Sequence, residues 1–288
     1  MNNFSNRIHV LWSLLTLQSK DCPYCRGKKT RRIGCNSPLS HVRECEDCRL
    51  IYRWPKQDAR FNHLFYQLSY IRLASDNMQL PTPAEAAALA ASDFRGHATA
   101  MGVKRDLVTR LQPGGRLCVY GANWGYEVSQ LARAGFDAIG YEISKPRAEF
   151  ARHLGVTVVT EWDAVRARAP FDVIYCSHTL EHLPSPQGVF DFFSDICAPT
   201  GCLVLFVPNC GGAEARRLGV KWGPFSSSLH PLSLRAEFFK HALPRHGFES
   251  VSAFSDPYDP GQVREPGPSG ELNGDELLIV ARRRPVSP

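Results

Sequence analysis

The chain has 288 residues, of which 43% are hydrophobic and 22% charged, and this composition excludes a disordered or fibrous protein. It contains enough residues for one full α/β domain and a smaller module. No apolar stretch approaches the ~20 residues that a membrane-spanning helix needs, so we expect no membrane span. The apolar segment 8–17 has leucines at helical spacing and no small-residue cleavage site after it. It predicts an N-terminal amphipathic helix rather than a signal peptide.

The formal net charge of +6 is concentrated at the N-terminus. Residues 1–60 contain twelve Lys and Arg against five Asp and Glu, whereas the remainder is near neutral. Such a basic face suits contact with RNA, an anionic glycan or a nucleotide-linked substrate. A solvated surface explains it at least as well.

Two CxxC pairs with nineteen residues between them follow the first segment. Each pair directs two sulfurs to one point, and zinc prefers four soft ligands in a tetrahedron. The spacing therefore predicts a structural zinc ion held by Cys22, Cys25, Cys45 and Cys48. We expect Cys35 and His41, which lie between the pairs, to be bystanders. Metal-binding cysteines favour a reducing compartment, so we expect a cytoplasmic location.

Three units are predicted along the chain. Residues 1–60 form the zinc-binding module with the N-terminal helix, and residues 61–110 form a helical linker or lid. In residues 111–288, strands alternate with helices, which predicts a mostly parallel sheet covered on both faces. The expected strands are 116–120, 138–142, 156–159, 171–176, 203–207, 251–254 and 277–281, and the expected helices 126–134, 146–154, 187–197 and 234–246.

A glycine-rich turn connects the first of these strands to its helix. It reads Gly121-Ala-Asn-Trp-Gly125, and such a turn lets a ligand approach the backbone and the free N–H groups of the helix. Glu142 ends the second strand, 21 residues after Gly121, where a carboxylate can accept hydrogen bonds from ribose hydroxyls. The turn alone does not distinguish methyl transfer from nicotinamide chemistry.

Several motifs together resemble class I S-adenosylmethionine-dependent methyltransferases. The similar runs are 116–152, 171–184, 201–209, 222–234 and 274–282. The segment from Cys45 to Pro55 also resembles the zinc module that precedes this domain in one bacterial subgroup. The resemblance implies an α/β fold with a Rossmann-like, mostly parallel seven-stranded sheet and an antiparallel last strand, behind a small zinc-ribbon-like module. The implied activity is methyl transfer from S-adenosylmethionine.

The resemblance also implies the cofactor-binding residues. Gly121, Ala122, Asn123 and Gly125 would line the methionine and ribose, Glu142 would hold the ribose, Ile143 would contact the adenine, and Asp163 would meet the adenine amino group. Asp163 is equally well explained as a solvated acid. Two departures from the family pattern occur, because Val119 replaces the usual acidic residue and Asn123 the usual middle glycine. Both would weaken cofactor binding.

The catalytic candidates follow the fourth strand. His178, Glu181 and His182 have i, i+3, i+4 spacing, which predicts one face of a helical turn. His230 would join them from beyond the fifth strand. Three roles stay open: a histidine base oriented by Glu181, a divalent metal site that holds the acceptor oxygen, or a structural turn.

The favoured function is therefore methyl transfer to a hydroxyl or carbon of a small-molecule or glycan acceptor. The first alternative is an RNA methyltransferase whose basic zinc module binds RNA. The second is a catalytically inactive cofactor-binding scaffold, which the departures at Val119 and Asn123 suggest. A nicotinamide-dependent oxidoreductase fits the fold, but not the loop after the fourth strand.

Overall fold

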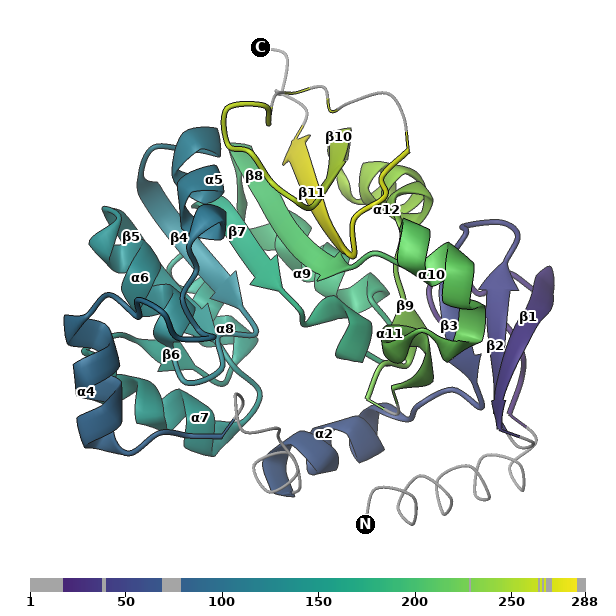
Figure 1. The fold of residues 1–288 in the computed structure, drawn as a ribbon, viewed down its shortest axis with the longest axis horizontal. Coiled ribbons are helices and arrows are strands. Elements are labelled where there is room, and N and C mark those ends of the chain that lie inside the picture. Colours follow the sequence, from purple (N-terminus) through teal and green to yellow (C-terminus); the bar gives the residue numbers. More distant parts are fainter. Residues whose placement is uncertain are drawn as a thin grey trace.

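The structure is a computed structural model that describes residues 18–37, 40–68, 79–227, 229–263, 265, 267 and 271–283. The N-terminal helix expected at 8–17 lies outside these residues. Within them the chain forms a seven-stranded and a four-stranded sheet, with helices around the larger one (Figure 1). None of the described helices is long and apolar enough to cross a membrane.

The larger sheet confirms the predicted α/β fold. Its strands lie in the order β10-β11-β8-β7-β4-β5-β6. The five strands β4 to β8 are parallel, and β11 is antiparallel to both β8 and β10. The bounds are β4 (Gly115–Tyr120), β5 (Phe136–Tyr141), β6 (Val158–Val159), β7 (Phe171–Ser177), β8 (Cys197–Pro208), β10 (Phe248–Ser255) and β11 (Glu276–Arg283).

Helices cover both faces of this sheet, which explains why its central strands are continuous apolar runs. Leu107 and Val128 pack on one face, and Phe190 and Phe238 on the other. The helices are α2 (Ala59–Leu68), α4 (Pro83–Ala91), α5 (Val103–Leu111), α6 (Tyr126–Arg133), α7 (Lys145–Phe150), α8 (Trp162–Arg166), α9 (Gln187–Ile196), α10 (Ala213–Leu218), α11 (Gly223–Ser226) and α12 (Ala236–Ala242). The short 3-10 helices are η2 (Ala151–Leu154), η3 (Leu180–His182), η4 (Gly219–Lys221) and η5 (Leu243–His246).

The expected helices end earlier than the sequence pattern indicated. The helices predicted at 146–154 and 234–246 are each a short α-helix followed by a 3-10 turn, α7 with η2 and α12 with η5. Both turns end at a glycine with positive φ, Gly155 at 69° and Gly247 at 82°. Glycine adopts this left-handed conformation without steric cost and so terminates the helical segment.

The smaller sheet joins the cysteine segment to the larger domain. It has the order β1-β2-β3-β9, all antiparallel, with β1 (Thr30–Ser37), β2 (Ser40–Cys45) and β3 (Ile51–Trp54). The fourth strand, β9 (Leu232–Ser233), comes from far along the chain and was not predicted. Tyr24 also packs edge-on against Phe238, with 5.3 Å between ring centroids. The cysteine segment therefore shares a sheet and a core with the rest of the chain.

Candidate active site

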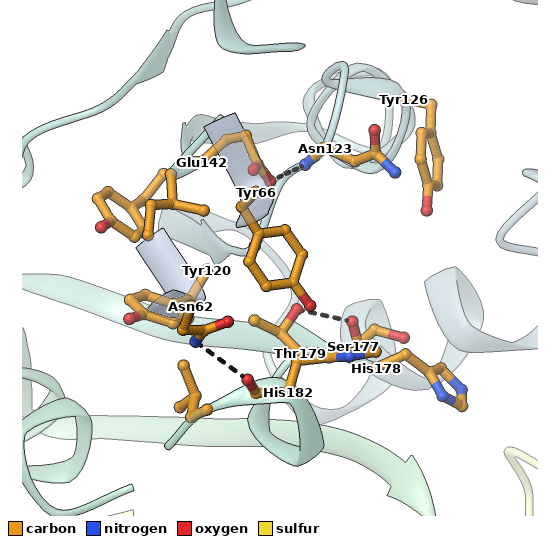
Figure 2. A pocket seen from close by; sticks show the side chains of 14 residues that line it. Asn62, Tyr66, Tyr120, Asn123, Tyr126, Glu142, Ser177, His178, Thr179 and His182 are labelled. Carbon is orange, nitrogen blue, oxygen red and sulfur yellow. Dashed lines mark hydrogen bonds between the residues drawn. The ribbon is translucent and has the colours of Figure 1, made fainter. Parts of the chain in front are cut away.

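A cavity of about 280 Å³ lies where β4, β5 and β7 end (Figure 2). The chain leaves β4 toward β5 on one side and returns to β7 on the other, so strand order reverses there, and open α/β sheets bind ligands at such a point. The lining residues are Asn62, Tyr66, Tyr120, Gly121, Asn123, Tyr126, Tyr141, Glu142, Ile143, Ser177, His178, Thr179, His182 and Leu183.

Gly121 is required where β4 meets the cavity. Its φ is 83°, and a Cβ atom there would lie 2.1 Å from Oγ1 of Thr179. Any larger residue would be strained in its backbone and would collide with the loop after β7. The predicted role of this glycine in a tight turn thus has a geometric reason in the structure.

Glu142 is held at the end of β5 by backbone groups. Its Oε2 accepts a hydrogen bond from the Asn123 N–H at 2.9 Å, and its Oε1 accepts one from the Ser144 N–H at 2.8 Å. The residue is only 7% exposed, and burial raises the pKa of its carboxyl above the ordinary value. A carboxylate oxygen has more than one acceptor position. Glu142 is therefore fixed by the backbone and retains acceptor positions at the cavity that it lines.

Asn123 replaces the usual middle glycine without closing the cavity. Its φ is 50°, a left-handed conformation that asparagine tolerates better than most residues. Its Oδ1 accepts hydrogen bonds from the Trp124 N–H at 2.9 Å and from the buried guanidinium of Arg147. Val119 is fully buried in the core and does not line the cavity. Neither departure from the family pattern obstructs the site.

The other predicted cofactor-binding residues lie in three different places: the cavity wall, the glycine-rich turn and the surface. Ile143 lines the cavity, whereas Ala122 and Gly125 belong to the turn but are not among the lining residues. Ala122 is fully buried, and a Cβ atom added at Gly140 would lie 2.5 Å from its Cβ. Asp163 lies on α8 with its side chain 92% exposed and pairs with Arg166 at 2.8 Å. The structure thus places Asp163 at the surface and away from the cavity.

His178 has a conformation that differs from the predicted helical turn. Its φ is 47°, and only Glu181 and His182 lie on the 3-10 helix η3 that follows. Its Nε2 lies 2.5 Å from Oε2 of Glu276 and its Nδ1 lies 3.3 Å from Oε1 of Glu181. Burial alone would lower the pKa of His178, but the two carboxylates outweigh it and raise the pKa to about 9. His178 is therefore an imidazolium at neutral pH in this structure.

The other three catalytic candidates come together although His230 is distant in sequence. One ligand atom from each of Glu181, His182 and His230 lies within 4.8 Å of the others. The rings of His182 and His230 are edge-on, with 4.6 Å between centroids. Burial lowers the pKa of His230 to about 4. His182 also lines the cavity, so the three residues adjoin it.

The four predicted zinc ligands also form a cluster. One sulfur from each of Cys22, Cys25, Cys45 and Cys48 lies within 4.8 Å of the others. The Cys22–Cys48 and Cys25–Cys45 sulfurs are 3.5 Å and 3.6 Å apart. These separations exceed a disulfide bond and match the ~3.8 Å between two sulfurs that are each ~2.3 Å from one tetrahedral zinc ion. The thiols therefore fit zinc.

The two bystanders lie outside this cluster. Cys35 is exposed, and the His41 ring stacks on Trp54 with 5.7 Å between centroids.

Two cavity residues on α2 were not predicted. Asn62 and Tyr66 reach the cavity from a segment that was predicted to be a helical linker or lid, with none of its residues assigned to the site. Asn62 donates a hydrogen bond from Nδ2 to the His182 carbonyl, and Gln67 donates one from Nε2 to the Ile143 carbonyl. The aromatic and amide content of the segment was the available signal. The position of α2 over the cavity depends on tertiary contacts, which the spacing of residues along the sequence does not indicate.

The fold, this cavity and the match to a family model together define the chain as a Rossmann-like S-adenosylmethionine-dependent methyltransferase. Residues 94–253 match the family model described as a methyltransferase domain. Because the match covers more than half of the chain, the chain belongs to this family.

Individual known proteins are more distantly similar. A ubiquinone biosynthesis O-methyltransferase from Methylococcus capsulatus is 31% identical over 98 residues, which are 31% of this chain and 41% of that protein. The chain thus matches about two fifths of that relative's length. A SAM-dependent methyltransferase structure from Thermotoga maritima is 19% identical, covers 65% of this chain and 91% of that chain, and has a TM-score of 0.49. The N-terminal domain of EvdMO1 with SAH bound is 18% identical, covers 63% and 80%, and has a TM-score of 0.43.

Proposed function

We propose that this protein transfers a methyl group from S-adenosylmethionine to a hydroxyl or carbon of a small-molecule or glycan acceptor. The proposal depends on the position of Glu142. Two backbone N–H groups fix its carboxylate in the cavity where strand order reverses. This is where a ribose would be held. Gly121, Asn123 and Ile143 line the same side and would contact the remainder of the cofactor.

The opposite side of the cavity would receive the acceptor. Ser177, His178, Thr179 and His182 line that side, with Glu181 buried behind them. The bound cofactor supplies a methyl group already activated on a sulfonium. The protein aligns the acceptor with it, excludes water and accepts the proton that the acceptor loses. We assign these tasks to His178, Glu181, His182 and His230. His182 or His230 would accept the proton, because the two carboxylates beside His178 raise its pKa to about 9.

The remaining residues would stabilise and cover this site. We propose that residues 1–60 hold one structural zinc ion, that residues 61–110 form a helical lid, and that residues 111–288 form the catalytic domain. The hydrogen bonds of Asn62 and Gln67 to opposite sides of the cavity support the lid. A cytoplasmic location fits the ten free cysteines.

Some basic residues of the N-terminal module are paired within the chain. Glu44 is 1% exposed at its side chain and pairs with Arg31, Arg49 and Arg235. One carboxylate balances one positive charge, so most of the basic excess of residues 1–60 remains. Binding to RNA that weakens steeply with salt would instead favour the RNA methyltransferase.

Calorimetric binding of S-adenosylmethionine and its demethylated product to zinc-replete protein tests the proposal. We expect micromolar binding of either ligand, and Glu142→Gln should weaken it at least tenfold. Asp137→Asn is the matched control, because this exposed acid lies at the opposite end of β5 and pairs with Arg168. If the wild type does not bind the cofactor at millimolar concentration, the proposed enzyme activity is wrong and the inactive-scaffold alternative is favoured.

A further inference from the structure

We propose that Glu181, His182 and His230 bind a divalent transition-metal cation, separate from the four-cysteine site. Their ligand atoms lie within 4.8 Å of one another, and two of the three residues are adjacent on η3. His230 approaches from the segment before β9. The cation site is inferred from these contacts alone. Its role in holding an acceptor oxygen depends on the proposed methyl transfer.

Glu181 provides a buried carboxylate that lacks hydrogen-bond partners. The residue is 2% exposed, and among the described residues neither carboxylate oxygen has a partner with hydrogen-bond geometry. Its nearest basic atom is Nδ1 of His178, at 3.3 Å. Leaving a buried carboxylate without such partners is costly, because burial removes its hydration. A bound cation would offset this cost directly.

Both imidazoles are oriented as metal ligands usually are. Nδ1 of His182 lies 3.0 Å from the Leu229 carbonyl oxygen, and Nδ1 of His230 lies 3.2 Å from the Pro224 carbonyl oxygen. A carbonyl only accepts, so each Nδ1 carries the proton and each Nε2 keeps its lone pair. Hydrogen bonds of this kind fix the tautomer and ring orientation of metal-bound histidines. Each ring therefore keeps one lone pair for a metal ion, and both histidines cluster with the Glu181 carboxylate.

The donor set defines the class of cation. Two imidazole nitrogens and one carboxylate suit Zn²⁺, Co²⁺, Fe²⁺ or Mn²⁺, whereas Mg²⁺ and Ca²⁺ prefer oxygen ligands. Three protein ligands leave at least one coordination position open. Because His182 also lines the cavity, this position would bind an acceptor oxygen presented to the cofactor.

Binding of Co²⁺ to protein whose cysteine site is already filled with zinc tests the inference. We expect one equivalent of Co²⁺ whose visible spectrum lacks thiolate charge-transfer bands. Glu181→Gln and His230→Gln should each weaken binding at least tenfold, and His63→Ala, an exposed histidine of α2, should not. Circular dichroism and calorimetry with S-adenosylhomocysteine on each variant verify that fold and cofactor cavity persist.

The outcomes separate this inference from the proposed function. Failure of Co²⁺ to bind, or equal binding in a folded Glu181→Gln protein, overturns the cation site even if S-adenosylhomocysteine binds. If all the bound Co²⁺ shows thiolate charge-transfer bands, it has only exchanged into the cysteine site. That result would equally overturn the Glu181–His182–His230 site. If Co²⁺ binds but S-adenosylhomocysteine does not, the cation site is supported and the proposed methyl transfer is contradicted.

Discussion

Asn62 on α2 donates a hydrogen bond from Nδ2 to the carbonyl oxygen of His182 at 3.2 Å (Figure 2). The contact joins the helix that precedes the catalytic domain to the 3-10 turn that carries the catalytic candidates. Asn62 is 7% exposed and lines the cavity. Helix α2 and the 3-10 turn η3 are thus connected directly.

Asn62→Ala should weaken cofactor binding because it removes this connection. One hydrogen bond contributes roughly 1 kcal/mol, so we expect the Kd for S-adenosylhomocysteine to rise about five- to tenfold. Calorimetry measures the change, and His63→Ala is the control on the same helix. Equal affinities of Asn62→Ala and the wild type would show that α2 does not help to hold the cofactor.

Asn123→Ala should destabilise the protein more than Asn123→Gly. Both variants remove the oxygen that accepts from Arg147 and Trp124, but alanine is also strained at a φ of 50°. The left-handed conformation costs a non-glycine residue roughly 1–2 kcal/mol. Urea denaturation should give the order wild type, then Gly, then Ala. A glycine variant as stable as the wild type would mean that the buried guanidinium does not need this oxygen.

Cys45→Ser should remove the zinc ion and lower the stability of the whole chain. The thiol is fully buried in the cluster, and β3 and Tyr24 connect this segment to β9 and Phe238. Metal-held modules lose their folding free energy with the metal. Elemental analysis should find one zinc per chain in the wild type and in the Cys35→Ser control. Zinc retained by Cys45→Ser would contradict the four-cysteine assignment.

Glu127 should make the unfolding free energy depend on pH. Burial raises the pKa of its carboxyl from 4.5 to about 7, although the Tyr175 hydroxyl donates to it at 3.0 Å. The folded state therefore binds more protons than the unfolded state between these values, so stability falls as pH rises from about 4.5 to about 7. The full effect is on the order of 3 kcal/mol.

Glu127→Gln should abolish most of this dependence, because glutamine does not titrate. Urea denaturation at a series of pH values compares it with the wild type and with Glu149→Gln, an exposed glutamate of α7. A slope unchanged by Glu127→Gln would assign the pH dependence to other groups.

The sequence alone determined the features that depend on local spacing. The CxxC pairs predicted the cysteine cluster because each pair directs its own two sulfurs. The alternation of strands and helices predicted the parallel sheet, since each pattern reports burial of its own element. Gly121 and Glu142 were predicted from a glycine-rich turn after one strand and an acid at the end of the next, 21 residues on, and both line the cavity.

Only the tertiary structure decided which distant groups meet. Asp163 had a plausible position in sequence, yet α8 directs it to solvent, where Arg166 pairs with it. Asn62 and His230 reach the cavity region because α2 and the segment before β9 pack there. Such contacts arise from the closure of long chain segments around a common core, and no local pattern records which segments will be neighbours.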